Sequence, residues 1–146
     1  MTMHRRPVGR TRLLAAIGAL VALAGCFLPW WTVGGDAGLP VQSGNAFDSL
    51  GILVFGAAIA TLALVTLPFA SERPVSADRW SSYAIFAGVG WLGFVYRVID
   101  LATSSAFQFS APVEILTRIP GVWLAGIGLF ILARATYEML QEPRLR

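Results

Sequence analysis

The chain has 146 residues, of which 56% are hydrophobic and 13% are charged, and its mean hydropathy is +0.68. Soluble globular domains have about 45–50% apolar and about 25% charged residues, so this composition excludes a soluble domain and predicts a chain embedded in lipid. The formal net charge of +3 comes from eleven arginines and eight acidic residues, and the sequence contains no lysine. The length accommodates about four membrane spans of ~20 residues with short connections.

In chain order, a basic leader over residues 1–12 precedes four apolar stretches that are long enough to cross a bilayer. We expect spans at about residues 13–33, 50–70, 80–100 and 120–140, with outer loops at 34–49 and 101–119. Each span is predicted to be a helix, because backbone polar groups in hydrocarbon must be hydrogen-bonded within the segment. The expected fold class is an all-α integral membrane four-helix bundle that forms one domain over residues 1–146.

Two interpretations are open for the first span, in which Leu23-Ala24-Gly25-Cys26 follows a basic leader and an apolar core. These features resemble a bacterial lipoprotein signal peptide, in which Cys26 would carry lipid and residues 1–25 would be removed. The alternative is an uncleaved span in which Cys26 is a small buried thiol. The apolar sequence continues through Trp31 and three further spans follow, which favours the uncleaved span.

The arginines predict the orientation of the spans, because basic residues are concentrated in cytoplasmic segments. With the N-terminus inside the cell, nine arginines fall on the inner side, and Arg97 and Arg118 fall on the outer side. We therefore expect both termini in the cytoplasm and the protein in the plasma membrane. Aromatic residues are expected to anchor both interfaces, namely Trp30, Trp31, Tyr96 and Trp123 outside and Trp80, Tyr83 and Tyr137 inside.

Small residues four positions apart predict where the helices pack. Helices in lipid gain no hydrophobic attraction for one another, so close backbone approach through Gly and Ala becomes important. Each span carries one such pair: Gly18 with Ala22, Gly56 with Ala60, Ala84 with Gly88, and Gly121 with Ala125. We expect these four pairs to mark a tightly packed bundle.

The connections also carry local signals. Asn45 is predicted to cap the second span, with Asp48 completing a capping box. Pro112 and Pro120 each suit the first turn of a helix, and Pro112 would begin a short interfacial helix in the second outer loop. Within that helix, Glu114 and Arg118 have the spacing of a favourable ion pair.

The candidate site lies at the outer end of the third span. Gly90, Gly93 and Arg97 share one helical stripe, which predicts that Arg97 points into the bundle and pairs with Asp100. An ionisable residue within a span is by default a candidate functional residue. The full predicted cluster consists of Asp48, Arg97, Asp100, Glu114 and Arg118.

Two roles are open for this cluster. It could form a polar vestibule that binds an anionic headgroup or a charged small molecule through its arginines. Alternatively, it could be an electrostatic clasp that pins the helix ends, with Arg97 reaching toward the interface. Opposite charges are nearly balanced in the cluster, which leaves little net field for a ligand and favours the clasp.

Several classes of function lack the residues they need. With Cys26 as the single cysteine and His4 as the single histidine, the chain cannot form an internal disulfide, a paired-cysteine redox site or an iron–sulfur centre. Nucleotide-binding and metalloprotease motifs are absent from the sequence. We expect no catalytic residue, no cofactor, no metal site and no nucleic-acid partner. The first two spans also lack an ionisable side chain, which argues against a carrier that acts alone.

Four short motifs suggest a family. They are Phe27-Leu28-Pro29-Trp30-Trp31, Ala46-Phe47-Asp48-Ser49-Leu50-Gly51-Ile52-Leu53, Tyr96-Arg97-Val98-Ile99-Asp100 and Gly121-Val122-Trp123-Leu124-Ala125-Gly126-Ile127-Gly128. Together they resemble the small four-span integral membrane proteins of GC-rich Gram-positive bacteria, which share a Leu-Pro-Trp element, an Arg near the outer end of span three and a Gly-x-Trp-Leu-Ala start to span four. The resemblance implies a fold and a location but no activity. The segment between Asp100 and Gly121 is longer here than that family pattern.

The expected function is that of a non-enzymatic multi-pass membrane protein that associates with membrane lipid and with other envelope components. Two alternatives remain open at the level of the sequence. The chain could form part of a transport or channel assembly by self-association, with Arg97 and Asp100 at its outer mouth. It could instead bind or modify lipid through the same pair.

Overall fold

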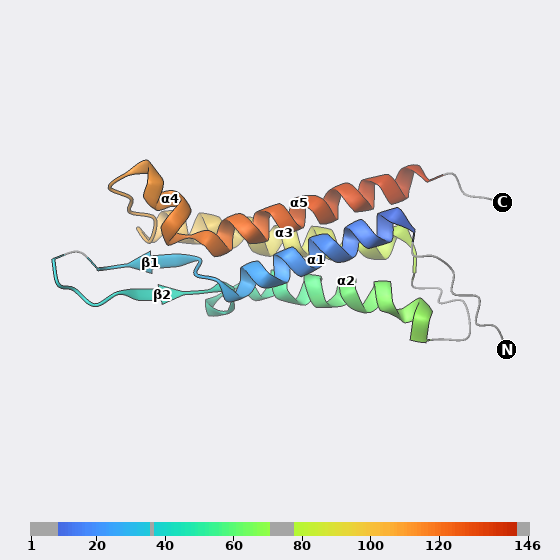
Figure 1. Cartoon of the computed structure of the whole chain (residues 1–146), viewed down its shortest axis with the longest axis horizontal. Coiled ribbons are helices and arrows are strands. Elements are labelled where there is room, and N and C mark those ends of the chain that lie inside the picture. The colour runs from blue at the N-terminus through green and yellow to red at the C-terminus, as the bar shows by residue number, and fades with distance from the viewer. Residues whose placement is uncertain (1–8, 36, 71–77, 143–146) are drawn as a thin grey trace.

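A computed structural model describes residues 9–35, 37–70 and 78–142 of the chain. The elements within these ranges are α1 (Arg10–Phe27), β1 (Trp31–Val33), β2 (Gln42–Gly44), the 3-10 helix η1 (Ala46–Asp48), α2 (Ile52–Ala70), α3 (Trp80–Thr103), α4 (Pro112–Arg118) and α5 (Pro120–Gln141). The helices α1, α2, α3 and α5 run along the long axis of the molecule, and β1, β2 and α4 lie together at one end (Figure 1). We call this the hairpin end, and we call the opposite end, where α1 begins and α5 ends, the terminal end.

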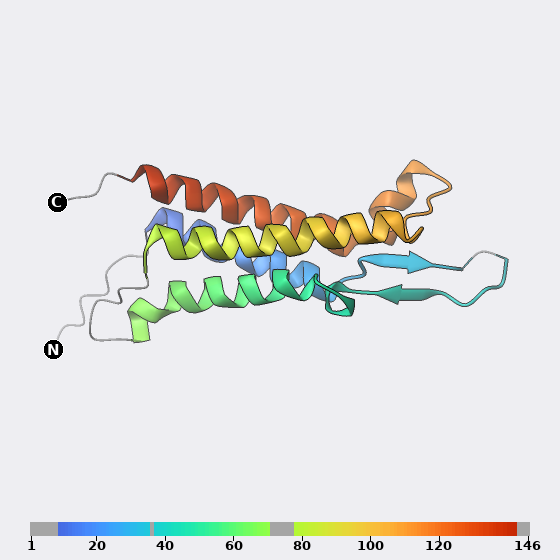
Figure 2. The same ribbon diagram turned by 180° about the vertical axis from the view of Figure 1, so that it is seen from behind.

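The four long helices form a closed bundle. The helix α1 packs against α2 and α5, and α3 packs against the same two helices. Seen from behind, α3 lies between α2 and α5 (Figure 2). Each of these four helices is long and apolar enough to cross a membrane. The prediction of four apolar helices in one bundle is therefore confirmed.

The expectation of an all-α fold is wrong at the end of the first span. Helix α1 ends at Phe27, six residues before the predicted position 33, and Trp31–Val33 instead forms a strand that pairs antiparallel with Gln42–Gly44. Pro29 explains the early end, because proline disfavours the helical conformation for the residue before it, and Leu28 is extended with φ −83° and ψ 159°. Tryptophan, threonine and valine then favour a strand.

The remaining predicted boundaries differ by smaller amounts. Helix α2 begins at Ile52 because η1 occupies the preceding segment, and Asn45 caps η1 rather than α2 by accepting a hydrogen bond of 3.0 Å from Phe47 N. Helix α3 continues to Thr103, and the predicted interfacial helix is present as α4. Pro112 and Pro120 lie in the first turns of α4 and α5. The segment between the second and third predicted spans, residues 71–79, lies outside the described residues except for its last two positions.

Helices α1 and α5 make the most extensive helix–helix contact in the described bundle. Their small residues allow the two backbones to touch, as the predicted pairs Gly18/Ala22 and Gly121/Ala125 require. A Cβ atom added to Gly128 would lie 2.6 Å from the Cα of Ala22 and 2.7 Å from the carbonyl oxygen of Gly18. Both small-residue pairs lie at this contact, so the predicted packing of these two helices is confirmed.

The small-residue pairs predicted for the other two helices are wrong. Gly56 and Gly88 are exposed, and a Cβ added to either would meet open space. Helix α3 instead turns Gly90 and Gly93 toward its neighbours, where an added Cβ would lie 2.8 Å from Leu129 Cδ2 of α5 and 2.8 Å from Leu50 O, respectively. Gly and Ala are so frequent in these helices that spacing alone cannot identify the packed face.

Trp30 was expected at the membrane interface, and the structure places it in the core. Its side chain is 0% exposed, and its Nε1 donates a hydrogen bond of 2.9 Å to Gly25 O at the end of α1. The ring packs edge-on against Phe94 of α3, with 5.7 Å between centroids. Because the chain leaves the helix at Leu28, the indole folds back over the last turn of α1 and fills the hairpin end of the bundle.

Two hydroxyl groups that are buried between the described helices are satisfied within their own helices. Thr61 donates a hydrogen bond of 2.8 Å to Ala57 O, and Thr136 donates one of 2.9 Å to Leu132 O. Such bonds to the preceding turn remove the need for a partner across the interface. Shape complementarity between small and aliphatic side chains therefore holds the middle of the bundle together.

We expect Gly128→Ala to destabilise the protein and Gly56→Ala to leave it unchanged or more stable. The new methyl group at residue 128 meets the backbone of α1, and overpacking of this kind costs about 1–3 kcal/mol. At residue 56 the same change meets open space. Thermal unfolding in mild detergent, followed by circular dichroism, measures both effects. Equal midpoints for the two variants would show that α1 and α5 do not touch as described.

Candidate functional site

Arg97 lies on the buried face of α3, as the sequence predicts. The buried residues of this helix repeat along one stripe: Tyr83, Ala87, Gly90, Gly93, Arg97 and Leu101. Because Gly90 and Gly93 bring α3 against its neighbours, Arg97 follows them into the hairpin end of the bundle and is only 7% exposed. Its Nη1 atom lies 2.5 Å from Oδ2 of Asp100 on the next turn.

The Arg97–Asp100 pair spans the boundary between the core and the surface. The Arg97 side chain is 9% exposed and the Asp100 side chain is 41% exposed. A buried charge is tolerated when it is paired and hydrogen-bonded, and Asp100 supplies that partner from the same helix. The Nε atom of Arg97 is also buried, and no residue in the described ranges accepts a hydrogen bond from it.

Asp48 binds the β-hairpin. Its Oδ2 atom accepts a hydrogen bond of 3.2 Å from Nε1 of Trp31, so the end of η1 is attached to β1. Gly44 of β2 lies beneath this contact, and a Cβ at this position would overlap both the carboxylate and the indole ring. A shallow pocket of about 190 Å³ beside the contact is lined by Phe27, Pro29, Ser43, Gly44, Asn45 and Asp48.

Glu114 and Arg118 pair within α4, as their spacing predicts. Arg118 Nε lies 3.5 Å from Glu114 Oε2, and the same carboxylate oxygen accepts a hydrogen bond of 2.9 Å from Ser110 N ahead of the helix. The carbonyl oxygen of Arg118 accepts one of 2.9 Å from Thr32 Oγ1. This pair therefore belongs to a helix that is attached to β1.

The five predicted residues thus form three separate contacts at the hairpin end. Arg97 pairs with Asp100 within α3, Glu114 pairs with Arg118 within α4, and only Asp48 joins two elements, η1 and β1. Each acid has a donor beside it, as an electrostatic clasp requires. This geometry favours the clasp over a vestibule built for an anion.

A second polar network at the terminal end was not predicted from the sequence. Arg12 Nη2 of α1 lies 2.6 Å from Asp78 Oδ2, and Asp78 Oδ1 accepts a hydrogen bond of 3.3 Å from the hydroxyl of Tyr83. Thr11 Oγ1 also donates a hydrogen bond of 2.8 Å to Glu142 Oε1 beyond α5. The network borders a pocket of about 250 Å³ and joins the terminal ends of α1, α3 and α5.

Tyr83 illustrates why this network was missed. It was expected to lie at the inner interface as an anchor, but its side chain is 1% exposed and points into the network. Its partner Asp78 precedes α3 and its neighbour Arg12 begins α1, so no spacing rule connects them. The available signal was the opposite charge of Arg12 and Asp78 at the same predicted membrane face.

The fold and these contacts define a class of protein. Four candidate membrane-spanning helices in one closed bundle are compatible with a multi-pass helical membrane protein. Within the described ranges, no group of three or more His, Cys, Asp or Glu residues is placed to bind a metal ion. The chain matches no protein-family model, no curated protein and no solved structure.

A double-mutant cycle tests the clasp. We expect Arg97→Met and Asp100→Asn to be coupled by about 1 kcal/mol in the free energy of unfolding, because one partner is buried and each change leaves the other charge unpaired. The matched control is Arg134 with Glu138 on α5, a pair at 2.9 Å whose side chains are 62% and 30% exposed. Exposed helical pairs of this kind contribute about 0.3–0.5 kcal/mol. Additive effects at Arg97 and Asp100 would refute the clasp.

Proposed function

We propose that this chain is a non-enzymatic multi-pass protein of the plasma membrane that associates with other envelope components through its hairpin end. One observation carries the proposal: β1 and β2 extend beyond the long helices (Figure 1), and apolar side chains are exposed at the end of β1 and in the loop that connects it to β2. Val33, Leu39 and Val41 are 48%, 65% and 64% exposed. Exposed apolar side chains gathered on one element are typical of an interaction site.

The hairpin suits a protein partner better than a small molecule. The two strands form a sheet of their own, so each has an outer edge at which an extended segment of another chain could pair. The base of the hairpin is also fixed to the bundle through Trp30, Trp31 and Thr32. This arrangement fits an accessory subunit that binds the outer part of another membrane protein.

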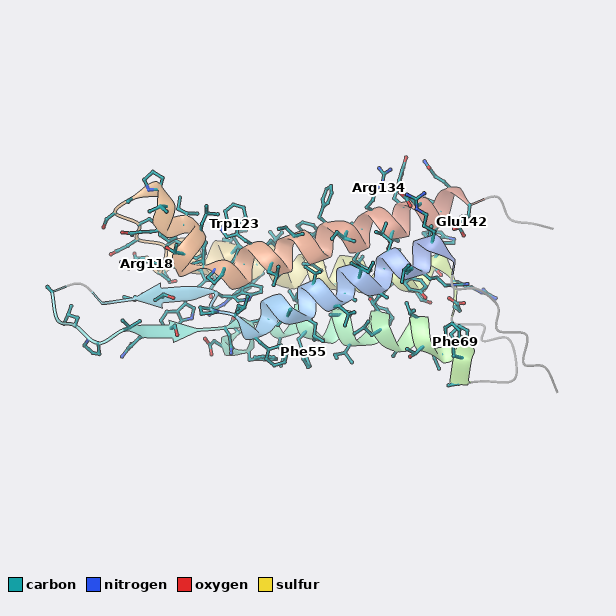
Figure 3. All side chains as sticks on the ribbon, viewed as in Figure 1. Phe55, Phe69, Arg118, Trp123, Arg134 and Glu142 are labelled. Carbon is teal, nitrogen blue, oxygen red and sulfur yellow. The ribbon has the colours of Figure 1, made fainter. Side chains whose placement is uncertain are left out.

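We further propose that both termini face the cytoplasm, so that the hairpin end faces outward. In the described ranges, Arg10, Arg12, Arg79 and Arg134 belong to the terminal end, and Arg97 and Arg118 belong to the hairpin end. Figure 3 shows Arg134 and Arg118 at opposite ends of the bundle. This asymmetry supports the orientation through the preference of basic residues for the cytoplasmic side. The other five arginines of the predicted count lie outside the described residues.

An uncleaved first helix is part of the same proposal. Residues 10–25 supply most of α1, including Gly18, Ala22 and Gly25, which contact α5. Cys26 itself is 0% exposed in the bundle. Cleavage before Cys26 would remove the surface on which α5 packs, so an intact N-terminus is consistent with this fold. We also propose, on the motifs quoted above, that the chain belongs with the small four-span proteins of GC-rich Gram-positive bacteria.

A second candidate function is lipid binding at Arg97. The buried Nε atom of this residue, which has no acceptor among the described residues, favours it. An anionic headgroup at the hairpin end would supply the acceptor that this atom lacks among the described residues. In this case Arg97→Ala would release a bound anionic lipid.

Native mass spectrometry of the protein extracted from its own membrane tests the proposal. We expect a defined complex with a different protein, and we expect Leu39→Asp with Val41→Asp to abolish it, because charges replace the exposed apolar side chains. Charges at exposed positions of the long helices, such as Ile59→Asp with Phe130→Asp, would prevent membrane insertion and cannot serve as the control. The matched control is therefore the conservative pair Leu39→Ile with Val41→Ile. A symmetric oligomer of this chain alone would instead favour the transport or channel alternative. Anionic lipid that is lost on Arg97→Ala would favour the second candidate.

The orientation has its own test. In a background with Cys26→Ala, we expect Leu39→Cys to react with a membrane-impermeant maleimide in intact cells and Gln141→Cys to react only after the cells are opened. Leu39 is 65% exposed on the hairpin, and Gln141 is exposed at the end of α5. The reverse pattern would place the termini outside and would contradict the proposed orientation.

A further inference from the structure

Helix α4 exposes an apolar face and keeps its charged face partly covered. The side chains of Glu114 and Arg118 are only 22% and 21% exposed. The apolar residues Val113 and Leu116, on the opposite face, are 63% and 62% exposed. A helix on the surface of a soluble protein shows the reverse arrangement, with apolar residues inward and charges outward. Helix α4 thus presents two large apolar side chains to its surroundings, together with the polar Thr117, and keeps its charged pair partly covered.

Polar contacts fix which face of α4 turns toward the protein. Ser110 N donates to Glu114, Thr32 of β1 donates to the carbonyl oxygen of Arg118, and Trp123 of α5 donates a hydrogen bond of 3.0 Å from Nε1 to Ile115 O. These contacts hold the Glu114–Arg118 side of the helix near β1 and the backbone of Ile115 near α5. Val113 and Leu116 remain on the side that faces away from the described protein.

The outer face of α4 continues an apolar stripe along α5. Trp123, Ile127 and Phe130 repeat every three or four residues, so they share one side of α5, and they are 47%, 52% and 67% exposed. Because Trp123 is hydrogen-bonded to α4, this short helix lies at the hairpin end of the stripe. Val113 and Leu116 therefore extend a surface that α5 presents to its surroundings.

The length of α5 places α4 at the boundary of the bilayer. The exposed charged pair Arg134–Glu138 marks the opposite boundary on this helix. From Glu138 back to Pro120 the helix rises by about 27 Å, and the hydrocarbon layer is about 30 Å thick. The second boundary thus falls at or just beyond the start of α5, which is where α4 lies.

We propose that α4 is an interfacial anchor whose Val113 and Leu116 side chains insert among lipid acyl chains, with the Glu114–Arg118 pair on the side of the protein and water. The occupant of this face is lipid, because the face continues the lipid-facing stripe of α5 at the depth of the interface. The anchor holds α4, and through Thr32 also β1, at a fixed height above the bilayer. It operates with either orientation of the chain and does not depend on the proposed partner.

Fluorescence of site-specific labels in lipid vesicles tests the anchor. Starting from Cys26→Ala, the single-cysteine variants Val113→Cys, Leu116→Cys, Leu39→Cys and Phe130→Cys are labelled with an environment-sensitive nitrobenzoxadiazole and reconstituted at low protein-to-lipid ratio. We expect labels at residues 113 and 116 to emit at short wavelength. Lipids that carry a nitroxide near the headgroup should quench them by about twofold, as insertion at the headgroup–acyl boundary requires. Leu39 is the matched control, since it is 65% exposed on the hairpin and should remain in water.

Each other result would overturn the anchor. Emission typical of water and quenching by aqueous iodide at residues 113 and 116 would place α4 outside the lipid. Short-wavelength emission without quenching by nitroxide lipids would show that a protein surface, such as a second copy of the chain, covers the face. The label at Phe130→Cys reports on the stripe of α5 itself. If nitroxides deep in the bilayer fail to quench it, the stripe does not face lipid, and α4 has no lipid-facing surface to continue.

Discussion

The close contact between α1 and α5 is the constraint on which the rest of the structure depends. Gly18, Ala22 and Gly25 of α1 and Gly128 of α5 let the two backbones touch. Such close packing is what holds helices together in a bilayer, where hydrophobic attraction between helices is absent. Since β1 follows α1 and α4 precedes α5, this contact also places the hairpin beside α4. Two hydrogen bonds record the result: Gly121 N donates to Pro29 O at 2.9 Å, and Thr32 Oγ1 donates to Arg118 O at 2.9 Å.

The predictable parts of this fold are those encoded locally. Four apolar runs identified the four long helices, because hydrocarbon demands a helix wherever the chain crosses it. Pro112 and Pro120 marked helix starts for a local steric reason. The hairpin escaped prediction because its strands are only three residues long and Trp31–Val33 read as the continuation of an apolar span. Burial of Trp30 depends on how the chain turns after Leu28, which residue composition does not record.

For the polar contacts too, those within one helix were predictable and those between distant parts of the chain were not. Arg97 with Asp100, and Glu114 with Arg118, are separated by three and four residues on single helices, so helical geometry predicted both pairs. Arg12 and Asp78 join residues from distant parts of the chain, as do Thr11 and Glu142. Their pairing depends on the tertiary arrangement of the helices, and the sequence offers only a weak signal for one of them, the opposite charges of Arg12 and Asp78 at the same predicted membrane face. Local spacing thus predicted the ion pairs at the hairpin end of the bundle but not the polar contacts at the terminal end.

The joint between α1 and β1 has a mechanical consequence. Trp30 is locked by its bond to Gly25 O and by its ring contact with Phe94, and Pro29 restricts the backbone immediately before it. The strand that follows therefore starts in a fixed position over the last turn of α1. A substitution that frees the Trp30 side chain would consequently loosen the base of the hairpin and the end of the first helix together.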